Sequence, residues 1–155
     1  MNAMHDIFMR AALALAREAE SAREVPVGAV VVVDGAIVGS GRNSPIALHD
    51  PTAHAEILAL RAAAARAANY RLENATVYVT LEPCPMCAGA LLAARVARLV
   101  FAARDLRFGG VRSKLRIADS DLFNHQVEII EGVLAPECVE LLQHFFASRR
   151  APPSA

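Results

Sequence analysis

The chain has 155 residues, and its 16 Lys and Arg residues balance its 16 Asp and Glu residues, so its formal net charge is zero. Hydrophobic residues make up 55% of the chain and charged residues 21%, which is typical of a globular protein and excludes a disordered one. Its apolar runs are much shorter than the roughly 20 residues that span a bilayer. A neutral chain has no overall attraction to nucleic acid, so an RNA-binding surface would have to be a local basic patch.

Hydrophobic periodicity divides the chain into helices and strands joined by short loops. Apolar residues at helical spacing mark the helices, whereas β-branched runs bounded by Gly, Pro, Asn or Asp mark the strands, with Asp34-Gly35 as a hairpin turn. In chain order we expect a helix at residues 4–21, strands at 25–33 and 36–41, a helix at 53–69, a strand at 75–81, a helix at 86–95, strands at 98–103 and 126–131, and a helix at 137–149.

This order predicts one α/β domain over residues 1–150 and a disordered tail at residues 151–155. The first two strands form a hairpin and the later ones are linked through helices, so we expect a mixed sheet of about five strands with helices on both faces. We expect a loop at residues 42–52, with Thr52 as the N-cap of the helix that follows. Residues 109–121, which begin with a Gly-Gly pair, have no assigned structure.

Two of the three cysteines form the pattern Cys84-Pro-Met-Cys87 at the start of a predicted helix. Cysteines three residues apart at a helix N-terminus can place both sulfurs on one metal ion, and the helix N-terminus stabilises the thiolate that binds it. His54, at the start of another predicted helix, adds an imidazole. Three protein ligands leave the fourth tetrahedral position for water, which is typical of catalytic zinc rather than structural zinc.

Glu56 follows His54 by two residues on the same predicted helical turn, so its carboxylate can reach the fourth position without being a ligand. Zinc lowers the pKa of a bound water to about 7. Glu56 is therefore the candidate that takes a proton from this water, delivers it to a ring nitrogen and later assists the loss of ammonia. A His-x-Glu pattern followed by Pro-Cys-x-x-Cys is that of zinc-dependent nucleobase deaminases.

The cysteine pair also fits two roles without catalytic zinc. A Cys-x-x-Cys pair serves redox chemistry in many proteins. A structural zinc site needs a fourth protein ligand, for which His49 and His125 are the candidates. The N-terminal stretch mixes charged with apolar residues and is unlike a signal peptide, so we expect a cytoplasmic protein, in which structural disulfides are rare.

Five longer stretches extend the pattern over most of residues 24–150, namely EVPVGAV at 24–30, HDPTAHAEI at 49–57, TLEPCPMCAGA at 80–90, ARD at 103–105 and FF at 145–146. In this order they resemble the bacterial tRNA adenosine deaminases (TadA type) of the cytidine deaminase-like superfamily. The resemblance implies a three-layer α/β/α fold, one zinc ion per subunit, a homodimer and no organic cofactor. It also implies conversion of the wobble adenosine of a tRNA anticodon stem-loop to inosine.

The resemblance further implies roles for single residues. His54, Cys84 and Cys87 match the zinc ligands, and Glu56 matches the residue that shuttles protons. Asn43 matches a residue that holds the target nucleoside. The remaining implied contacts are Pro26, Val27 and Ala55 in the base pocket, and Asp105, Phe145 and Phe146 against the neighbouring anticodon nucleotides.

Some of these residues are equally suited to a purely structural role. Asn43 suits a turn before Pro45. Pro26 and Val27 suit the start of a strand, and Phe145 continues the apolar face of the last helix.

A basic stretch lies at residues 104–116, where five cations stand against Asp105 alone, a local balance of +4. Clustered Arg residues beside a flexible Gly-Gly pair suit contacts to RNA phosphates, and such binding weakens with salt. The alternative is a solvated, partly ordered loop. The candidate phosphate contacts are Arg104, Arg107, Arg112, Lys114 and Arg116, together with Arg149 and Arg150 at the end of the last helix.

Three functions therefore compete. The leading hypothesis is tRNA adenosine deamination. A zinc deaminase acting on guanine or another free base or nucleoside is the second, and the basic stretch argues against it because a small neutral base needs no phosphate-binding surface. The third is a non-catalytic zinc-containing nucleic-acid-binding module, which has no need for the carboxylate of Glu56 beside its one histidine ligand.

Overall fold

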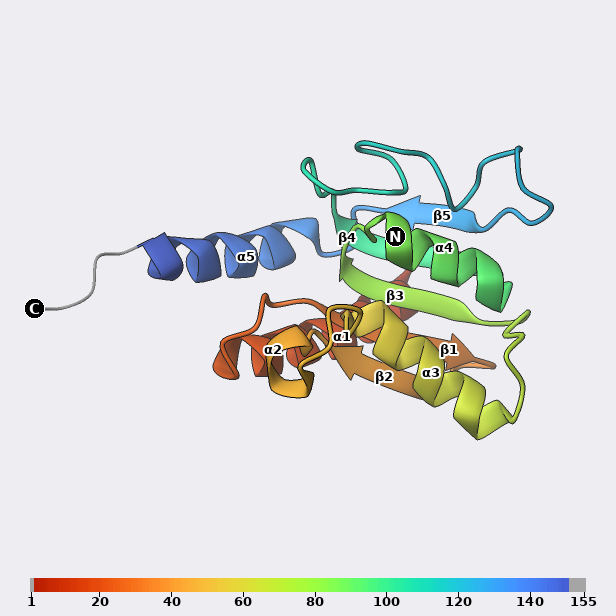
Figure 1. The fold of residues 1–155 in the computed structure, drawn as a ribbon, viewed down its shortest axis with the longest axis horizontal. Helices are drawn as coiled ribbons and strands as arrows, with labels where there is room; N and C mark the ends of the chain where they lie inside the picture. Colours follow the sequence, from red (N-terminus) through yellow and green to blue (C-terminus); the bar gives the residue numbers. More distant parts are fainter. Residues whose placement is uncertain (1, 151–155) are drawn as a thin grey trace, which may run out of the picture.

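Residues 2–150, the part of the chain described by this computed structural model, form five strands and five helices (Figure 1). The predicted disordered tail at residues 151–155 lies outside the described residues. Among residues 2–150 no helix combines the length and the apolar character needed to cross a membrane. The strands are β1 (Gly28–Val33), β2 (Ala36–Arg42), β3 (Thr76–Leu81), β4 (Arg98–Ala103) and β5 (Glu128–Glu131). The helices are α1 (Ala3–Ser21), α2 (Pro45–Leu48), α3 (Ala55–Ala67), α4 (Pro85–Ala94) and α5 (Ala135–Arg150).

The strands form one mixed sheet in the order β2-β1-β3-β4-β5. β1 pairs antiparallel with β2 and β3, whereas β3, β4 and β5 run parallel. The hairpin between β1 and β2 turns at Asp34 and Gly35, whose φ angles of 51° and 75° suit a tight two-residue turn. The sheet confirms the α/β fold class predicted from the order of the elements.

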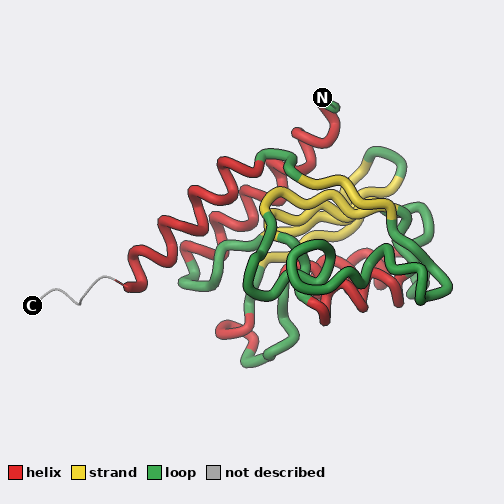
Figure 2. Tube along the Cα trace, turned by 90° about the horizontal axis from the view of Figure 1, so that it is seen from above, coloured by secondary structure: helices red, strands yellow, loops and turns green. Residues whose placement is uncertain are grey.

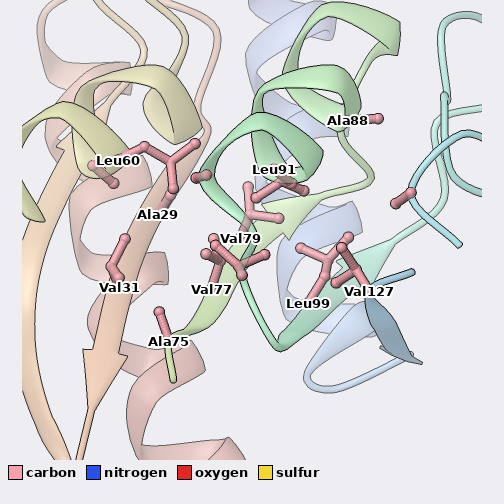
Figure 3. Close-up of a cluster of buried hydrophobic side chains, with 14 of the residues drawn as sticks. Ala29, Val31, Leu60, Ala75, Val77, Val79, Ala88, Leu91, Leu99 and Val127 are labelled. Carbon is pink, nitrogen blue, oxygen red and sulfur yellow. The ribbon is translucent and has the colours of Figure 1, made fainter. Parts of the chain in front are cut away.

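Helices cover both faces of the sheet (Figure 2). On one face α3 and α4 pack against side chains such as Val77, Val79 and Leu99, which belong to the cluster drawn in Figure 3. On the other face α1 and the beginning of α5 pack against Tyr78 and Val100. Successive side chains of a strand point to opposite faces, so β3 and β4 are buried on both sides, as parallel strands in a three-layer fold require.

The end of the sheet at the left of Figure 1 gathers the segments that carry the predicted site residues. β2, β3 and β4 end there, and β1, which is antiparallel to β2 and β3, begins there. α3 and α4 also begin at this end and run away from it. We call it the carboxyl end of the sheet; α/β folds commonly place their binding sites at such an end.

The first strand begins at Gly28, so the prediction that it begins at residue 25 is wrong. Pro26 has no N–H to donate, and the N–H of Val27 bonds to the carbonyl of Val25 at 2.8 Å. These residues therefore lead into the sheet but belong to no strand, although their composition is that of one and the carbonyl of Val27 accepts the N–H of Asn43 at 3.0 Å.

Two predictions between residues 42 and 54 are also wrong. Part of the expected loop is the short helix α2, and His54 rather than Thr52 stands at the N-cap position of α3. Thr52 instead donates its N–H and its hydroxyl to Oδ1 of Asp50, at 2.8 Å each. A helix of four residues is too short for its periodicity to be read from the sequence. The remaining elements begin and end within two residues of the predicted bounds.

Candidate active site

Three side chains at the carboxyl end of the sheet lie close enough to share one metal ion. Nδ1 of His54 is 3.6 Å from Sγ of Cys84 and 3.5 Å from Sγ of Cys87. The three atoms all lie within 4.8 Å of one another, and residues 2–150 contain no other group of this kind. Thiolate and imidazole ligands together suit a transition-metal ion. We refer to these three side chains as the donor group.

Two helix N-termini position the donor group. His54 is the N-cap residue of α3 and Cys84 that of α4, and neither side chain bonds to the backbone of its own helix. Cys87 lies in the first turn of α4, one turn after Cys84. Pro85 suits the first helical position because the N–H that it lacks would have no partner there. Since both helices begin at the same place, the positive ends of their dipoles favour thiolates in the donor group.

The two histidines considered as a fourth ligand lie elsewhere. His49 ends α2 in the left-handed conformation and is exposed. Nε2 of His125 donates to the carbonyl of Val96 at 2.8 Å. Within the described residues the donor group thus offers three protein ligands rather than four, the number typical of catalytic metal sites.

Electrostatics favour a thiolate at Cys84 before any ion binds. The hydrogen bond from Cys87, with the neighbouring His54, lowers the pKa of Cys84 to about 4 despite its burial. The hydrogen bond to Cys84 and burial raise the pKa of the Cys87 thiol. Binding of a cation by both sulfurs therefore displaces the proton of Cys87.

Glu56 lies beside the donor group but does not belong to it. The residue stands in the first turn of α3 and is only 4% exposed. Burial raises the pKa of its carboxyl to about 7, with the charge of Cys84 acting in the same direction. A carboxyl in this state can hold or release a proton near neutral pH, as general acid–base chemistry requires.

Asn43 connects the ends of the first two strands to the start of α3. Its Oδ1 accepts the N–H of Ala55 at 2.9 Å, and its own N–H donates to the carbonyl of Val27 at 3.0 Å. Ala55, Val27 and the preceding Pro26 are buried. The four residues predicted to hold or line the base therefore lie together, and the Nδ2 amide is the part of Asn43 that remains to meet a ligand.

Glu24 is a buried residue whose role the sequence did not reveal. It is 3% exposed, and its carboxylate accepts the N–H groups of Ile46 at 3.2 Å and Ala47 at 2.9 Å. Both donors belong to α2, so Glu24 fixes the segment that connects Asn43 to His54. These bonds join residues 22 and 23 positions apart, which no local pattern indicates.

Three of the five cations in the basic stretch form ion pairs. Arg112 makes a two-fold contact with Asp119, at 3.0 Å for each nitrogen, and Arg116 shares the same carboxylate at 3.2 Å. Arg104 bonds to both carboxylate oxygens of Glu131, at 2.8 and 3.1 Å. Both carboxylates lie after residue 116 in the sequence. The balance of +4, which counts only residues 104–116, therefore overstates the positive charge that is left unpaired in the stretch.

The other two cations of the stretch, Arg107 and Lys114, are exposed and form no ion pair with any part of residues 2–150. Asp105 lies at the carboxyl end of the sheet, where β4 ends. Its Oδ1 accepts the N–H groups of Arg107 at 3.0 Å and Phe108 at 3.1 Å, which closes a turn. The unpaired positive charge of the stretch therefore belongs to two residues.

The predicted contacts on α5 lie apart from these residues, on a helix that runs beyond the sheet (Figure 1). Phe145 is 5% exposed and packs under the guanidinium of Arg149, whereas Phe146 is 41% exposed. Arg149 also donates to the carbonyl of Arg23 at 2.6 Å, which attaches the end of α5 to the loop after α1. Arg150 is exposed. The burial of Phe145 fits the structural role that its place on the apolar face of the last helix allowed. Phe146 is exposed and can contact a partner.

The sequence matches the MafB19-like deaminase family over residues 3–150. It is 53% identical over 143 residues to a tRNA-specific adenosine deaminase of Haemophilus influenzae, and the match covers 92% of this chain and 83% of that protein. A structure from a study of A-to-I editing by tRNA:A34 deaminases at the wobble position of transfer RNA has a TM-score of 0.84 and 41% identity. That match covers 87% of this chain and 98% of the other.

A guanine deaminase from Nitrosomonas europaea has a similar fold, with a TM-score of 0.81. Its identity to this chain is 27%, over 92% of this chain and 84% of the other. The fold alone therefore does not distinguish a wobble adenosine from guanine as substrate, and the residues around the donor group must do so.

Proposed function

This chain belongs to the MafB19-like deaminase family and to the tRNA-specific adenosine deaminases, and we propose that it converts the wobble adenosine of a tRNA anticodon stem-loop to inosine. In this reaction water replaces the amino group at C6 of the base, which leaves as ammonia. The observation that carries the proposal is the donor group of His54, Cys84 and Cys87 with the buried carboxyl of Glu56 beside it.

We assign the donor group to one zinc ion. In a tetrahedral site with Zn–S of about 2.3 Å and Zn–N of about 2.0–2.1 Å, a nitrogen and a sulfur on the same ion lie about 3.6 Å apart. The separations of 3.6 and 3.5 Å between Nδ1 of His54 and the two sulfurs support this assignment. When bound, zinc supplies a Lewis acid that lowers the pKa of water to about 7 and so provides a nucleophile in neutral solution.

Glu56 moves the protons of the reaction. Its carboxylate takes a proton from the attacking water and passes it to the ring nitrogen beside C6. It then takes the proton of the new hydroxyl at C6 and passes it to the amino group, which leaves as ammonia. Its position in the first turn of α3, two residues after the N-cap residue His54, supports this role because the carboxylate adjoins the donor group without belonging to it. Burial of Glu56 keeps bulk water from competing for the proton.

Asn43 holds the target base through its Nδ2 amide. Its Oδ1 is already bonded to the N–H of Ala55, so Asn43 meets the substrate as a donor. A purine presents ring nitrogens such as N7 as acceptors. Pro26, Val27 and Ala55 supply the apolar walls of the base pocket, and their burial around Asn43 supports that role.

The RNA reaches the site as a single-stranded loop, from which a base can leave the stack. Asp105 and Phe146 contact the neighbouring nucleotides, and the buried Phe145 supports this contact by packing edge-on against Phe146, with the ring centroids 5.3 Å apart. Arg107 and Lys114 contribute most of the phosphate contacts because their charges are unpaired. The remaining candidates are Arg149 and Arg150, together with Arg104, Arg112 and Arg116, which reach a phosphate only by leaving their carboxylates.

Residues 1–150 act as one domain, and the protein works as a homodimer in the cytoplasm without an organic cofactor. The homodimer and the lack of an organic cofactor follow from the family resemblance of the sequence. The single domain follows from the order of the elements, and the cytoplasmic location from the short apolar runs and the charged residues of the first helix. The mass of the zinc-loaded protein in solution, measured by light scattering, tests the dimer.

Guanine is the second candidate substrate, because the fold is shared with a guanine deaminase. A free base fits the donor group and Glu56 equally well. It has no phosphate, however, and leaves the exposed charges of Arg107 and Lys114 without a function. The unpaired cations thus favour RNA.

The test is to incubate the zinc-loaded protein with an anticodon stem-loop that carries adenosine at the wobble position, digest the RNA and separate the nucleosides. We expect inosine in an amount equal to the ammonia released. A stem-loop with its only loop adenosine one position away serves as the control and should stay unreacted. Failure to form inosine by a protein that contains zinc would contradict the proposal.

A further inference from the structure

Glu82 is a buried carboxylate to which the reaction assigns no role. It directly follows β3 and is 2% exposed. Its Oε1 accepts the N–H of Asp105 at 3.0 Å and the hydroxyl of Ser113. Its Oε2 accepts the N–H groups of Val111 at 3.1 Å, Arg112 at 2.7 Å and Ser113 at 2.9 Å. One side chain thus receives five hydrogen bonds.

These bonds use the full hydrogen-bond accepting capacity of the carboxylate, which has about four lone-pair sites. All five donors come from residues 105–113, a segment of turns without helix or strand. Backbone N–H groups in such a segment have no ladder to join and need other acceptors. Within residues 2–150 no Lys or Arg side chain forms an ion pair with Glu82, so its buried charge is stabilised by these donors.

Two glycines allow the segment to lie directly on this carboxylate and on the start of α4. A Cβ at Gly109 would lie 2.3 Å from Oε2 of Glu82, and a Cβ at Gly110 would lie 2.7 Å from the backbone nitrogen of Pro85. The N–H of Gly110 also donates to the carbonyl of Pro83 at 2.7 Å. A side chain at either glycine would push the segment away from the turn that holds the donor group.

The outer side of the same segment suits single-stranded RNA. Phe108 is 66% exposed, and the neighbouring Arg107 is exposed and outside any ion pair of residues 2–150. Lys114, directly after the segment, is also exposed and outside any ion pair of residues 2–150. Proteins bind single strands with aromatic faces and unpaired cations of this kind. Glu82 therefore anchors, from inside, a segment whose outer side faces the RNA in the proposed function.

We infer that Glu82 is a positioning residue that holds residues 105–113 in place before RNA binds, so that nucleotides beside the target adenosine meet a preformed wall. The inference rests on the proposed function for the identity of the ligand, whereas the anchoring is a property of the free protein. A preformed loop avoids the cost of ordering on binding. Loss of the anchor should therefore weaken binding of the stem-loop more than it slows the chemical step.

The test compares Glu82→Gln with the wild type, both loaded with zinc. The amide keeps the shape of the side chain but turns an NH₂ group toward N–H donors. Hydrogen exchange at the amides of residues 111–113, zinc content, and kcat and KM on the wobble-adenosine stem-loop are measured. We expect faster exchange, retention of zinc, a KM raised about tenfold and a kcat within about threefold of the wild type.

Glu73→Gln is the matched control. Glu73 is an exposed carboxylate that precedes the start of β3, whereas Glu82 follows the end of that strand. The control variant should leave exchange, zinc content, kcat and KM unchanged. Ser113→Ala keeps the test decisive if Glu82→Gln does not fold, since it removes one bond to Glu82 and should cause the same changes on a smaller scale. Its control is Ser120→Ala, which removes a hydroxyl that bonds locally to Leu122.

Faster exchange with an unchanged KM would overturn the inference, because the anchored segment would then not meet the RNA. Loss of zinc with a lower kcat would also overturn it, since Glu82 would then act through the donor group. Unchanged exchange would show that the five bonds do not anchor the segment. A wild-type protein that leaves the stem-loop unreacted would instead contradict the proposed function, while the exchange experiment would still report on the anchor.

Discussion

The carbonyl oxygen of the Asn43 side chain accepts the backbone N–H of Ala55 at 2.9 Å. Ala55 is the first residue of α3 and stands between His54 and Glu56. The residue proposed to hold the base therefore also fixes the start of the helix that carries a metal ligand and the proton-transferring carboxyl. Any substitution at this position has to be judged for both roles.

Asn43→Asp separates the two roles. A carboxylate still accepts the N–H of Ala55, and its charge is favourable at a helix N-terminus, but it cannot donate to the base. We expect an unchanged or higher melting temperature and a kcat/KM lowered about tenfold or more. Asn43→Ala loses the side-chain bond from Ala55 as well as the donor to the base, so it should also destabilise the fold by about 1 kcal/mol. Full activity in the Asp variant would show that Asn43 is only structural.

Glu56→Gln should keep the metal and lose turnover. The donor group does not include Glu56, so zinc content should remain at one ion per chain. Loss of a positioned general acid–base should lower kcat by about 10²- to 10⁴-fold. Metal analysis and single-turnover kinetics measure the two quantities, with His54→Ala as the variant that should lose zinc. Disappearance of zinc from Glu56→Gln would mean that Glu56 is a ligand.

The cations of the basic stretch should differ in their effect on RNA binding. Removing one phosphate contact to a single strand reduces the slope of log K against log salt concentration by about 0.7. We expect this reduction for Arg107→Ala and for Lys114→Ala, whose charges are unpaired within residues 2–150. Arg112→Ala should instead lower the melting temperature and leave the slope near that of the wild type, because its partner is Asp119. Equal slopes for all three variants and the wild type would contradict this division.

Acid should weaken the fold through Asp119. The hydrogen bond from Arg112 and that from Arg116 lower the pKa of Asp119 below its usual 3.8, although burial opposes them. A carboxyl whose pKa is lower in the folded state stabilises the protein above its unfolded pKa, and this contribution is lost as the pH falls through the folded pKa. The urea midpoint of the wild type should therefore approach that of Asp119→Asn below pH 3.8.

The control for this measurement is Asp121→Asn, because Asp121 is exposed and forms no ion pair within residues 2–150. Its midpoint should follow the wild type at every pH. Wild-type and Asp119→Asn curves that stay parallel down to acid pH would show that the pair with Arg112 does not stabilise the fold.

Features of the molecule that depend on neighbouring residues could be predicted from the sequence. The apolar run at residues 99–103, which directly follows Arg98, indicated β4, because a strand buried on both faces needs no alternation. The spacing of Cys84 and Cys87 across a helix start indicated two donors on one ion. The position of Glu56 near His54 followed in the same way from their spacing of two residues at one helix start.

Features that depend on distant residues could not be predicted. α2 is too short to show a period and is held by Glu24, more than 20 positions away. The charge of the basic stretch looked free because Asp119 and Glu131 follow it in the sequence and fold back onto it. The five bonds to Glu82 likewise come from a segment that begins 23 positions later and has no pattern of its own.

Ammonia release from the wobble-adenosine stem-loop and from guanine, measured side by side with one preparation of zinc-loaded protein, tests the substrate most directly. We expect release from the stem-loop, with one inosine formed for each ammonia, and no release from guanine above the level of Glu56→Gln. Ammonia released from guanine by a protein that leaves the stem-loop unreacted would contradict tRNA adenosine deamination and assign the site to a free base.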